Sequence, residues 1–329
     1  MIQPVEMRQT LPMTLHGGFS STTTEVWEML TAARDGDLAR VTELTTKRPE
    51  LATCQFNYTP PLHFAVREGH LPVVRALVAQ GAFDPDYKAY PFGDTLLTMA
   101  EDRGYDGIAR VLRDALSRPG LSRKWTETGE IDFGQDEGRR EFEKSVHAGK
   151  YRKVERFLND RPELALDELS SWGEGVLMMP AKRSDRSLLE LLMRFGARVP
   201  AMSKWGRFYY FRHDDIAAFL LDKGMSSRHM TWHEVTLLHD MAQAGDVKKA
   251  ALLLDRGADI NAIDDEYRST PLGMAARWGH DRMVTFLLDR GADPNKAGAD
   301  WSRPFAWAKR KGHSRIADAL VAAGAVARS

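Results

Sequence analysis

The chain has 329 residues, and its 46 Lys and Arg residues balance its 46 Asp and Glu residues. A net charge of zero argues against a protein that binds nucleic acid or an acidic membrane surface through its overall field. Cys54 is the only cysteine, so no internal disulfide can form, and the cytoplasm is the expected location. No apolar run reaches the roughly 18 residues of a membrane-spanning helix, and the N-terminus does not resemble a signal peptide.

The N-terminal residues 1–24 have no apolar periodicity and are rich in Thr, Ser, Pro and Gly. This composition is typical of a segment that cannot bury a core of its own. We therefore expect residues 1–24 to form a flexible N-terminal arm.

A glycine recurs at nearly constant spacing between two short apolar patterns of helical period. It stands at Gly36, Gly69, Gly104, Gly149, Gly245, Gly279 and Gly312. Most neighbouring members of this series are 33 to 35 residues apart. The interval from Gly149 to Gly245 is nearly three times as long. We place two degenerate repeats in it, with Ser184 and Arg212 at the positions between their helices.

Residues 269–295 show the repeated pattern most completely. Thr-Pro-Leu at 270–272 opens a helix that Gly279 ends, and Gly291 ends a second helix with apolar residues at helical spacing. This unit resembles the ankyrin repeat, whose signature is T-P-L-H-x-A with a period of about 33 residues. The resemblance implies an all-α fold, an ankyrin-repeat solenoid of about nine helix-turn-helix repeats, two of them degenerate.

The same pattern divides the chain into segments. We expect ankyrin repeats 1–3 over residues 25–116, an irregular polar linker over 117–138, degenerate repeats 4–6 over 139–234, and regular repeats 7–9 with the C-terminal end over 235–329. The pentapeptide RPELA occurs at residues 48–52 and 161–165. Because proline cannot continue a helix, the second helix of each repeat is expected to end just before it.

Histidines occupy two recurring positions in the repeats. His63 and His239 stand at the fourth place of the signature, where the resemblance implies bonds to the backbone between repeats. His70, His280 and His313 directly follow the turn glycine. We assign all five to the scaffold rather than to a functional site.

The resemblance implies a non-catalytic protein–protein interaction scaffold, rather than an enzyme, that binds an unidentified protein partner on its concave face. Six loop tips each carry one aromatic side chain, and arginines stand at the ends of inner helices. The predicted partner-binding residues are Tyr58, Phe92, Trp172, Trp232, Tyr267, Trp301, Arg277 and Arg310. Aromatic side chains supply contact area at little entropic cost. The alternative is that each tip packs on its neighbour as a hydrophobic ladder.

The least regular stretch, residues 170–234, supports an alternative function. Ser184 and Arg212 are only 28 residues apart, so one loop is short and a notch is expected in the concave wall. The residues expected to line it are Trp172, Lys182, Arg183, Trp205, Arg207, Tyr209, Tyr210, Arg212 and His213. Aromatic faces stack on flat ligands and arginine holds anionic groups, so the notch would suit a small molecule or glycan, with or without catalysis. Decay of two repeats with compensating aromatics would give the same sequence.

Three common motifs of catalysis and cofactor binding are absent from the sequence. The sequence contains no G-x-x-x-x-G-K-[ST], no G-x-S-x-G and no C-x-x-C. His229 and His233 are four residues apart, a spacing that would place two metal ligands on one helical face. No H-E-x-x-H accompanies them, and His239 is assigned to the scaffold. We therefore predict no metal and no cofactor, and we assign no catalytic residue.

Overall fold

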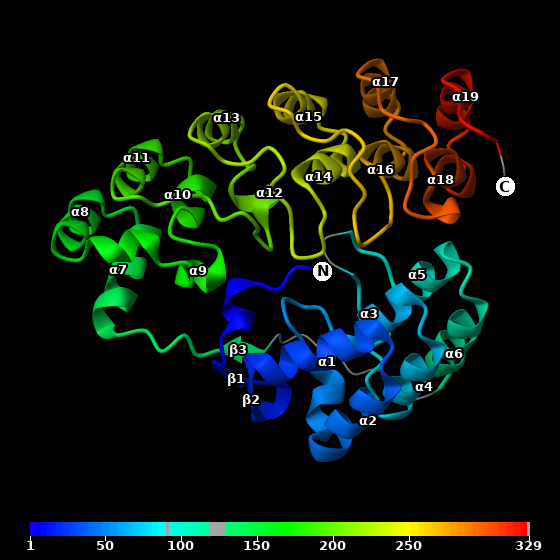
Figure 1. Ribbon diagram of the computed structural model, residues 1–329, viewed down its shortest axis with the longest axis horizontal. Helices are drawn as coiled ribbons and strands as arrows, with labels where there is room; N and C mark the ends of the chain where they lie inside the picture. The colour runs from blue at the N-terminus through cyan, green and yellow to red at the C-terminus, as the bar shows by residue number, and fades with distance from the viewer. Residues whose placement is uncertain (90–91, 119–128, 328–329) are drawn as a thin grey trace. The chain divides into compact units, whose positions relative to one another are not determined.

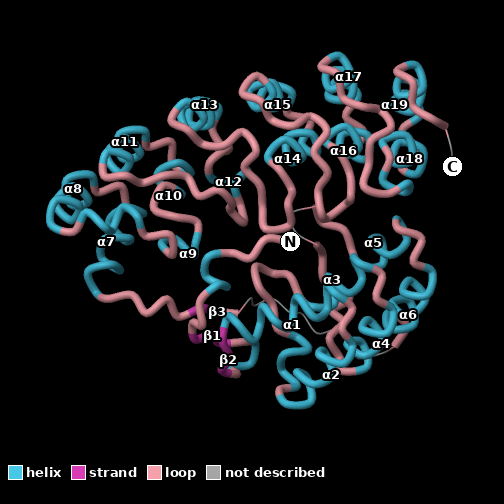
Figure 2. Tube along the Cα trace, in the orientation of Figure 1, coloured by secondary structure: helices cyan, strands magenta, loops and turns pink. Residues whose placement is uncertain are grey.

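The computed structural model describes residues 1–89, 92–118 and 129–327. They form two compact units (Figure 1). The N-terminal unit is Glu6–Gly134, and the C-terminal unit is Gln135–Ser329 together with Met1–Val5. Helices dominate both units, which confirms the predicted all-α class (Figure 2). Part of the predicted linker, residues 119–128, lies outside the described residues.

In the N-terminal unit, consecutive helices pack as antiparallel pairs in two layers (Figure 1). The pairs are α1 (Thr23–Asp35) with α2 (Leu38–Lys47), α3 (Pro61–Glu68) with α4 (Leu71–Ala79), and α5 (Leu96–Asp102) with α6 (Asp106–Leu116). The first helices of the pairs stack on one another, and so do the second helices. Stacking of this kind buries the apolar face that a single pair would leave exposed.

Short secondary-structure elements occur in the N-terminal residues, for which the sequence predicts a flexible arm. They include the 3-10 helices η1 (Val5–Arg8) and η2 (His16–Gly18) and the strands β1 (Pro12–Thr14) and β2 (Ser20–Thr22). β1 pairs antiparallel with β2 and with β3 (Glu130–Ile131). Met13 is buried in this sheet, and the Thr22 hydroxyl caps α1 by accepting the N–H of Glu25 at 3.2 Å. These contacts give the segment an ordered backbone without a long apolar pattern.

The C-terminal unit repeats the two-layer arrangement along an arc of helix pairs (Figure 1). The pairs are α7 (Glu137–His147) with α8 (Tyr151–Asp160), α10 (Met178–Lys182) with α11 (Arg186–Arg194), α12 (Gly206–Tyr209) with α13 (Asp214–Asp222), α14 (Leu237–Ala244) with α15 (Val247–Leu254), α16 (Pro271–Trp278) with α17 (Asp281–Asp289), and α18 (Pro304–Arg310) with α19 (Ser314–Ala322). The short α9 (Ser170–Gly173) precedes α10, and the 3-10 helix η5 (Asp300–Ser302) precedes α18. No described helix is long and apolar enough to cross a lipid bilayer.

The sequence of α16 and α17 shows why each pair folds. The Thr270 hydroxyl accepts the N–H of Gly273 at 3.2 Å and caps α16, whose first residue is proline. Met274 and Leu287 are completely buried, one in each helix of the pair. Each buried aliphatic side chain of this size contributes about 1.5–3 kcal/mol, so the helical period of the apolar residues determines the packing.

The predicted boundaries of the helices in the degenerate repeats, and those before the two RPELA segments, are confirmed. Ser184 lies between α10 and α11 with a φ of 57°, and Arg212 lies between α12 and α13. Both RPELA segments start a 3-10 turn at their proline, η3 (Pro49–Thr53) and η4 (Pro162–Leu166), directly after α2 and α8.

Four of the five scaffold histidines tie neighbouring pairs together through backbone carbonyls, as predicted, and Nδ1 of the fifth, His63, lies 3.1 Å from the Tyr87 hydroxyl. Nε2 of His70, His280 and His313 lies 2.7, 2.8 and 3.2 Å from the carbonyl oxygens of Arg34, Gln243 and Arg277. Nε2 of His239 lies 3.1 Å from the carbonyls of both Ala262 and Ser269. At the turn, Gly279 has a φ of 77°, and a Cβ there would lie 2.7 Å from the His313 ring. Glycine is therefore favoured at this turn for two reasons: its backbone adopts a positive φ without strain, and it leaves space for the His313 ring.

Candidate partner-binding site

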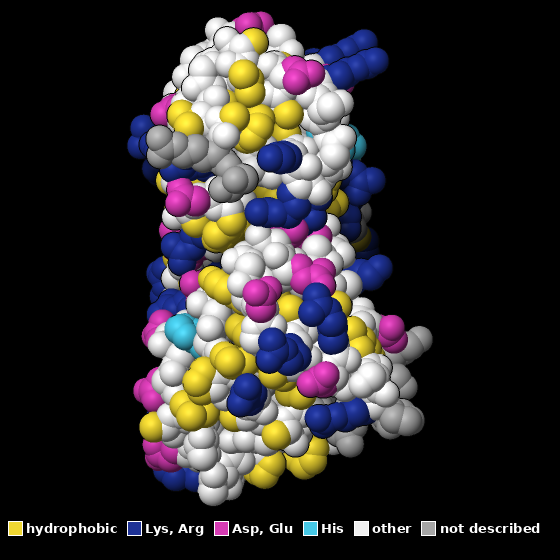
Figure 3. Space-filling model, turned by 90° about the vertical axis from the view of Figure 1, so that its right-hand side faces the viewer, with side chains coloured by type: hydrophobic (Ala, Val, Ile, Leu, Met, Phe, Trp, Pro, Cys, Tyr) yellow, Lys and Arg dark blue, Asp and Glu magenta, His cyan; other side chains and the backbone are white. Residues whose placement is uncertain are grey.

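Six side chains at the end of the C-terminal unit form one contiguous group, here called the aromatic–arginine cluster. Its members are Tyr267 from the loop before α16, Arg277 and Trp278 from the end of α16, Trp301 from η5, and Trp307 and Arg310 from α18. Four of these six, Tyr267, Trp301, Arg277 and Arg310, are among the residues predicted from the sequence to bind a partner. On the α18–α19 end of this unit, in the upper part of Figure 3, hydrophobic and basic side chains lie side by side.

Arg277 is the centre of the cluster. Its guanidinium carbon lies 4.7 Å from the ring centroid of Tyr267, 4.3 Å from that of Trp278 and 4.9 Å from that of Trp307. At these distances each aromatic face attracts the cation, by about 0.5–2 kcal/mol depending on its exposure to water. Arg277 is thus held by three rings, and the rings are fixed relative to one another.

Trp301 and Arg310 extend the cluster toward solvent. The Trp301 ring meets the Trp307 ring edge to face, with centroids 5.7 Å apart. Arg310 Nη1 donates to the Trp301 carbonyl at 3.2 Å, and its guanidinium carbon lies 4.9 Å from the Trp307 centroid. Trp301 is half-buried and Arg310 is exposed. Trp301 and Arg310 are therefore the part of the cluster that remains accessible to solvent while its orientation is fixed by neighbouring groups.

A buried carboxylate shapes the loop that carries Tyr267. Asp264 accepts the backbone N–H groups of Tyr267 and Ser269, at 2.5 and 3.0 Å. Burial raises the pKa of Asp264 above its usual value, and the two backbone hydrogen bonds only partly offset this effect. Ser269 Oγ in turn accepts the indole N–H of Trp307 at 3.2 Å. The loop and the cluster therefore share one hydrogen-bonded network.

The remaining predicted partner-binding residues lie elsewhere. Tyr58 and Phe92 belong to the N-terminal unit, where Tyr58 is exposed. Trp232 is buried, with its ring centroid 4.2 Å from that of His233. Trp172 is 60% exposed at the tip of α9 and belongs to a separate patch.

The backbone at Trp172 is unusual. Ser171 and Trp172 have φ angles of 55° and 61°, in the left-handed region that favours glycine. Contacts to α7 hold the turn: Glu143 Oε1 accepts the Ser171 N–H at 2.6 Å, and His147 Nε2 lies 3.0 Å from Ser171 Oγ. The His147 and Trp172 ring centroids are 5.8 Å apart. The exposed Trp172 ring is therefore held on a turn of left-handed backbone, and its binding to a partner stays a prediction.

Trp278 and Trp307 were missed at the sequence level. Both stand on inner helices, for which only basic side chains were predicted to bind a partner, whereas aromatic anchors were predicted only at loop tips. The signal available was a tryptophan directly before the turn glycine, Trp278 before Gly279, next to the predicted Arg277. Trp278 follows Arg277 on α16, and the stacking of α16 and α18 brings Trp307 onto the same guanidinium group.

The residues predicted to line a notch form several local contacts. Lys182 Nζ lies 5.5 Å from the Tyr209 ring centroid, Arg207 Nη1 donates to Gln243 Oε1 at 2.5 Å, and Trp205 packs edge to face on Phe208. Tyr210 is fully buried and donates its hydroxyl to the Glu174 carbonyl. Arg183 donates to the His147 carbonyl, His213 Nε2 lies 3.0 Å from the Lys182 carbonyl, and Arg212 is exposed. Tyr210, Arg183 and His213 thus hold neighbouring repeats together, and a ligand site in the notch stays a prediction.

The two histidines considered as metal ligands contact different groups. His229 Nε2 lies 2.9 Å from Ser203 Oγ, and both residues are buried. Burial lowers the pKa of His229 to about 4, so its ring is neutral near pH 7. His233 Nδ1 lies 3.0 Å from Glu266 Oε2. The Ser203–His229 contact joins the loop before α12 to the loop before α14.

Comparisons with known proteins agree with the helix pairs. A family model described as "Ankyrin repeats (3 copies)" matches residues 29–120, 208–298 and 238–328, more than half of the chain. The chain is also 28% identical over 247 residues to a protein of Oryza sativa subsp. japonica named "Probable E3 ubiquitin-protein ligase XBOS33". That match covers 74% of this chain and 40% of the relative, so the chain spans about two fifths of the relative's length. The capped helix pairs, the histidine ties and the family match together show that the chain belongs to the ankyrin repeat family.

Proposed function

We propose that the chain is a non-catalytic interaction module that binds a protein partner through the aromatic–arginine cluster. Ankyrin repeats generally mediate protein–protein interaction. The observation that carries the proposal is the enclosure of Arg277 by three aromatic rings beside Trp301 and Arg310. Tryptophan and arginine are the side chains most enriched among those that dominate binding energies. Because the rings already fix these groups, little side-chain entropy remains to be lost on binding.

The chemistry of the cluster favours one kind of partner surface. Guanidinium groups form charge-assisted, often bidentate hydrogen bonds with carboxylates, and an indole offers a flat apolar face. We propose that the partner presents carboxylates next to an apolar side chain. The buried thiol of Cys54, the sole cysteine, is consistent with a cytoplasmic location, which is part of the proposal.

The name of the rice relative does not extend this proposal to catalysis. Its name contains a ligase activity, but the match leaves three fifths of that protein without a counterpart here. An ankyrin array supplies a binding surface and does not by itself supply a reaction.

The proposal is tested by affinity capture with matched variants. Trp301→Ala with Arg310→Ala removes the accessible part of the cluster and leaves the buried Tyr267 and Trp307 in place. The control is Arg315→Ala, an exposed arginine on α19 without a described partner. Losing two dominant side chains, each contributing about 2 kcal/mol, weakens binding by roughly three orders of magnitude. We expect the partner to be absent from the double variant and retained by the control; retention by both would disprove the site.

A further inference from the structure

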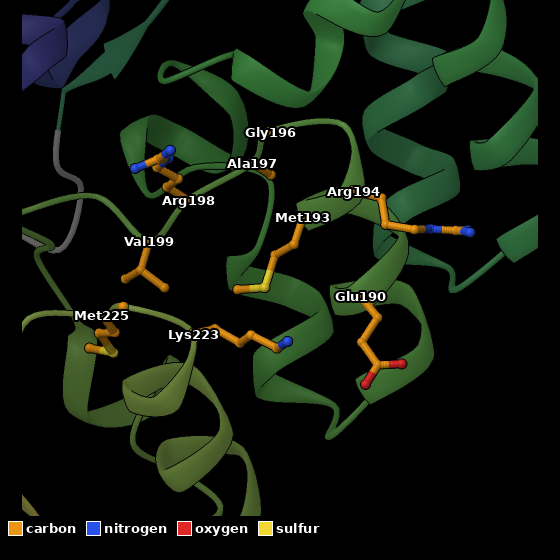
Figure 4. A pocket seen from close by; sticks show the side chains of 10 residues that line it. Glu190, Met193, Arg194, Gly196, Ala197, Arg198, Val199, Lys223 and Met225 are labelled. Carbon is orange, nitrogen blue, oxygen red and sulfur yellow. The ribbon is translucent and has the colours of Figure 1, made fainter.

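A groove lies on another face of the C-terminal unit, between the ends of α11 and α13 (Figure 4). Its volume is about 550 Å³, within the range of roughly 300–1,000 Å³ that is typical of binding sites. The lining residues are Glu190, Met193, Arg194, Gly196, Ala197, Arg198, Val199, Lys223, Gly224 and Met225. It is formed by the outer helices and the loops that follow them, whereas the aromatic–arginine cluster is formed by inner helices and loop tips.

Ion pairs join the ends of neighbouring outer helices in the repeats that follow the groove. Just after α15 and α17, the basic residue before the closing glycine pairs with an aspartate of the preceding repeat. Arg256 Nη2 lies 2.7 Å from Asp222, and Arg290 Nη2 lies 2.6 Å from Asp255. Each aspartate stands two residues before the glycine of its own repeat. The ends of these outer helices are therefore joined by one repeated contact.

The repeated contact fails between α11 and α13. Lys223 stands where Arg256 and Arg290 stand in the later repeats, but the position of the aspartate is occupied by Arg194. Two cations cannot pair, and Arg194 turns instead to α8, where Nη2 donates to the Tyr151 hydroxyl at 3.1 Å. Figure 4 shows the Arg194 side chain directed away from Lys223, with Met193 between the two helices. A like-charge pair at the position of an ion pair leaves the groove open and positive.

The lining of the groove combines an apolar floor with unpaired cations. Met193, Val199 and Met225 supply the floor, and methionine adapts its shape to different occupants. Neither Arg198 nor Lys223 forms an ion pair with any residue in the ranges 1–89, 92–118 and 129–327, and Lys223 Nζ lies 5.9 Å from the Phe219 ring centroid. The single acidic lining residue, Glu190, is already paired with Arg186 at 3.0 Å. The groove therefore lacks negative charge that could satisfy its cations.

We propose that this groove binds a linear protein segment that carries an apolar side chain flanked by carboxylates. The apolar side chain packs on the two methionines, and the carboxylates pair with Arg198 and Lys223. The groove is open to solvent, so it suits an extended segment that crosses it rather than a ligand enclosed on all sides. It is independent of the aromatic–arginine cluster, and either site can fail without the other.

The test uses short fluorescein-labelled peptides and fluorescence anisotropy with the full chain. The probe has one leucine flanked by glutamates; the reference peptides have glutamine in place of glutamate, or serine in place of leucine. We expect saturable binding of the probe that weakens with added salt, and at least about tenfold weaker binding of both reference peptides. Equal binding of the probe and the glutamine peptide would overturn the proposal.

Protein variants assign the binding to the groove. Arg198→Glu with Lys223→Glu is expected to weaken probe binding by at least about tenfold. Arg282→Glu with Arg315→Glu, two exposed arginines outside the groove, makes the same charge change and is expected to leave binding unaltered. Equal losses in both double variants would show unspecific attraction of charge and overturn the proposal. Circular dichroism and thermal melting confirm that each variant is folded.

The missing aspartate provides a third variant. Arg194→Asp is expected to pair with Lys223, as Asp222 pairs with Arg256, and to abolish probe binding while the array stays folded. Methyl NMR of the protein with labelled methionines should show shifts at Met193 and Met225 when the probe is added to the wild type. Unchanged binding by Arg194→Asp, or shifts confined to other methionines, would contradict the proposal.

Discussion

The turn glycines allow a direct test of the histidine ties between repeats. Gly279 and Gly312 occupy the same position in consecutive repeats, and both have a φ of 77°. A Cβ at Gly279 would lie 2.7 Å from the His313 ring, whereas a Cβ at Gly312 would meet nothing within 4 Å. Replacing each glycine by alanine therefore imposes the same backbone strain, but only Gly279→Ala also displaces a ring.

The structure gives the expected magnitudes. Alanine in the left-handed region costs about 1–2 kcal/mol, and this cost applies to both variants. In Gly279→Ala the His313 ring must also leave the Arg277 carbonyl, from which it lies 3.2 Å, and a lost hydrogen bond of this kind costs about 1 kcal/mol more. We expect the free energy of unfolding, measured by urea denaturation, to fall by about 1 kcal/mol more in Gly279→Ala than in Gly312→Ala.

His313→Ala supplies the control for this comparison. Without the ring, Gly279→Ala should cost only the backbone strain, so its effect in the His313→Ala background should match that of Gly312→Ala. If Gly279→Ala costs the same with and without His313, the ring does not determine the choice of glycine, and the explanation of the histidine ties is wrong.

Three further predictions concern buried and strained positions. Asp240 is buried and its pKa is raised to about 7, so on going from pH 4 to pH 7 the unfolded chain loses this proton before the folded chain does. Asp240→Asn should therefore leave the free energy of unfolding unchanged near pH 4 and raise it by on the order of 2 to 4 kcal/mol at pH 7. Urea denaturation at both pH values measures this, and a difference between variant and wild type that does not depend on pH would refute it. The variant Trp172→Gly should be about 1 kcal/mol more stable than Trp172→Ala in the same assay, because alanine is strained at a φ of 61° and glycine is not. Equal stabilities of the two variants would show that the backbone at this position is not strained. A Cβ at Gly206 would lie 2.7 Å from Ser203 Oγ, so Gly206→Ala should lower the thermal midpoint of unfolding. The decrease should be smaller in a Ser203→Ala background, which lacks this oxygen. An equal decrease in both backgrounds would exclude the clash with Ser203 as the cause.

The regular repeats were predictable because each one carries several independent sequence signals for the same structure. In α16 and α17 the threonine cap, the proline of the first turn, the apolar period and the two glycines all indicate the same helix pair. The degenerate repeats could be placed for a related reason: Ser184 adopts the left-handed backbone of the glycine it replaces, and Gly196 still follows at the usual interval.

The functional surface was harder to predict because it depends on contacts between repeats. The Trp307 ring reaches Arg277 only because α16 and α18 stack, and Trp307 had no sequence signal that distinguished it from a core residue. Trp232 and Trp172 were both predicted to bind a partner because both stand at loop tips, but Trp232 is buried and Trp172 is exposed. The N-terminal strands were missed because segments of three residues carry too little pattern to be read.

Photocrosslinking in cells tests the proposed binding surface most directly. A benzophenone amino acid is introduced in place of Lys309, an exposed residue beside Arg310 on α18, or in place of Arg282 on α17 as the control. We expect a discrete crosslinked protein from position 309 that is absent from position 282 and disappears when Trp301 and Arg310 are replaced by alanine. No crosslink from position 309, or one that persists in that double variant, would contradict binding through the aromatic–arginine cluster.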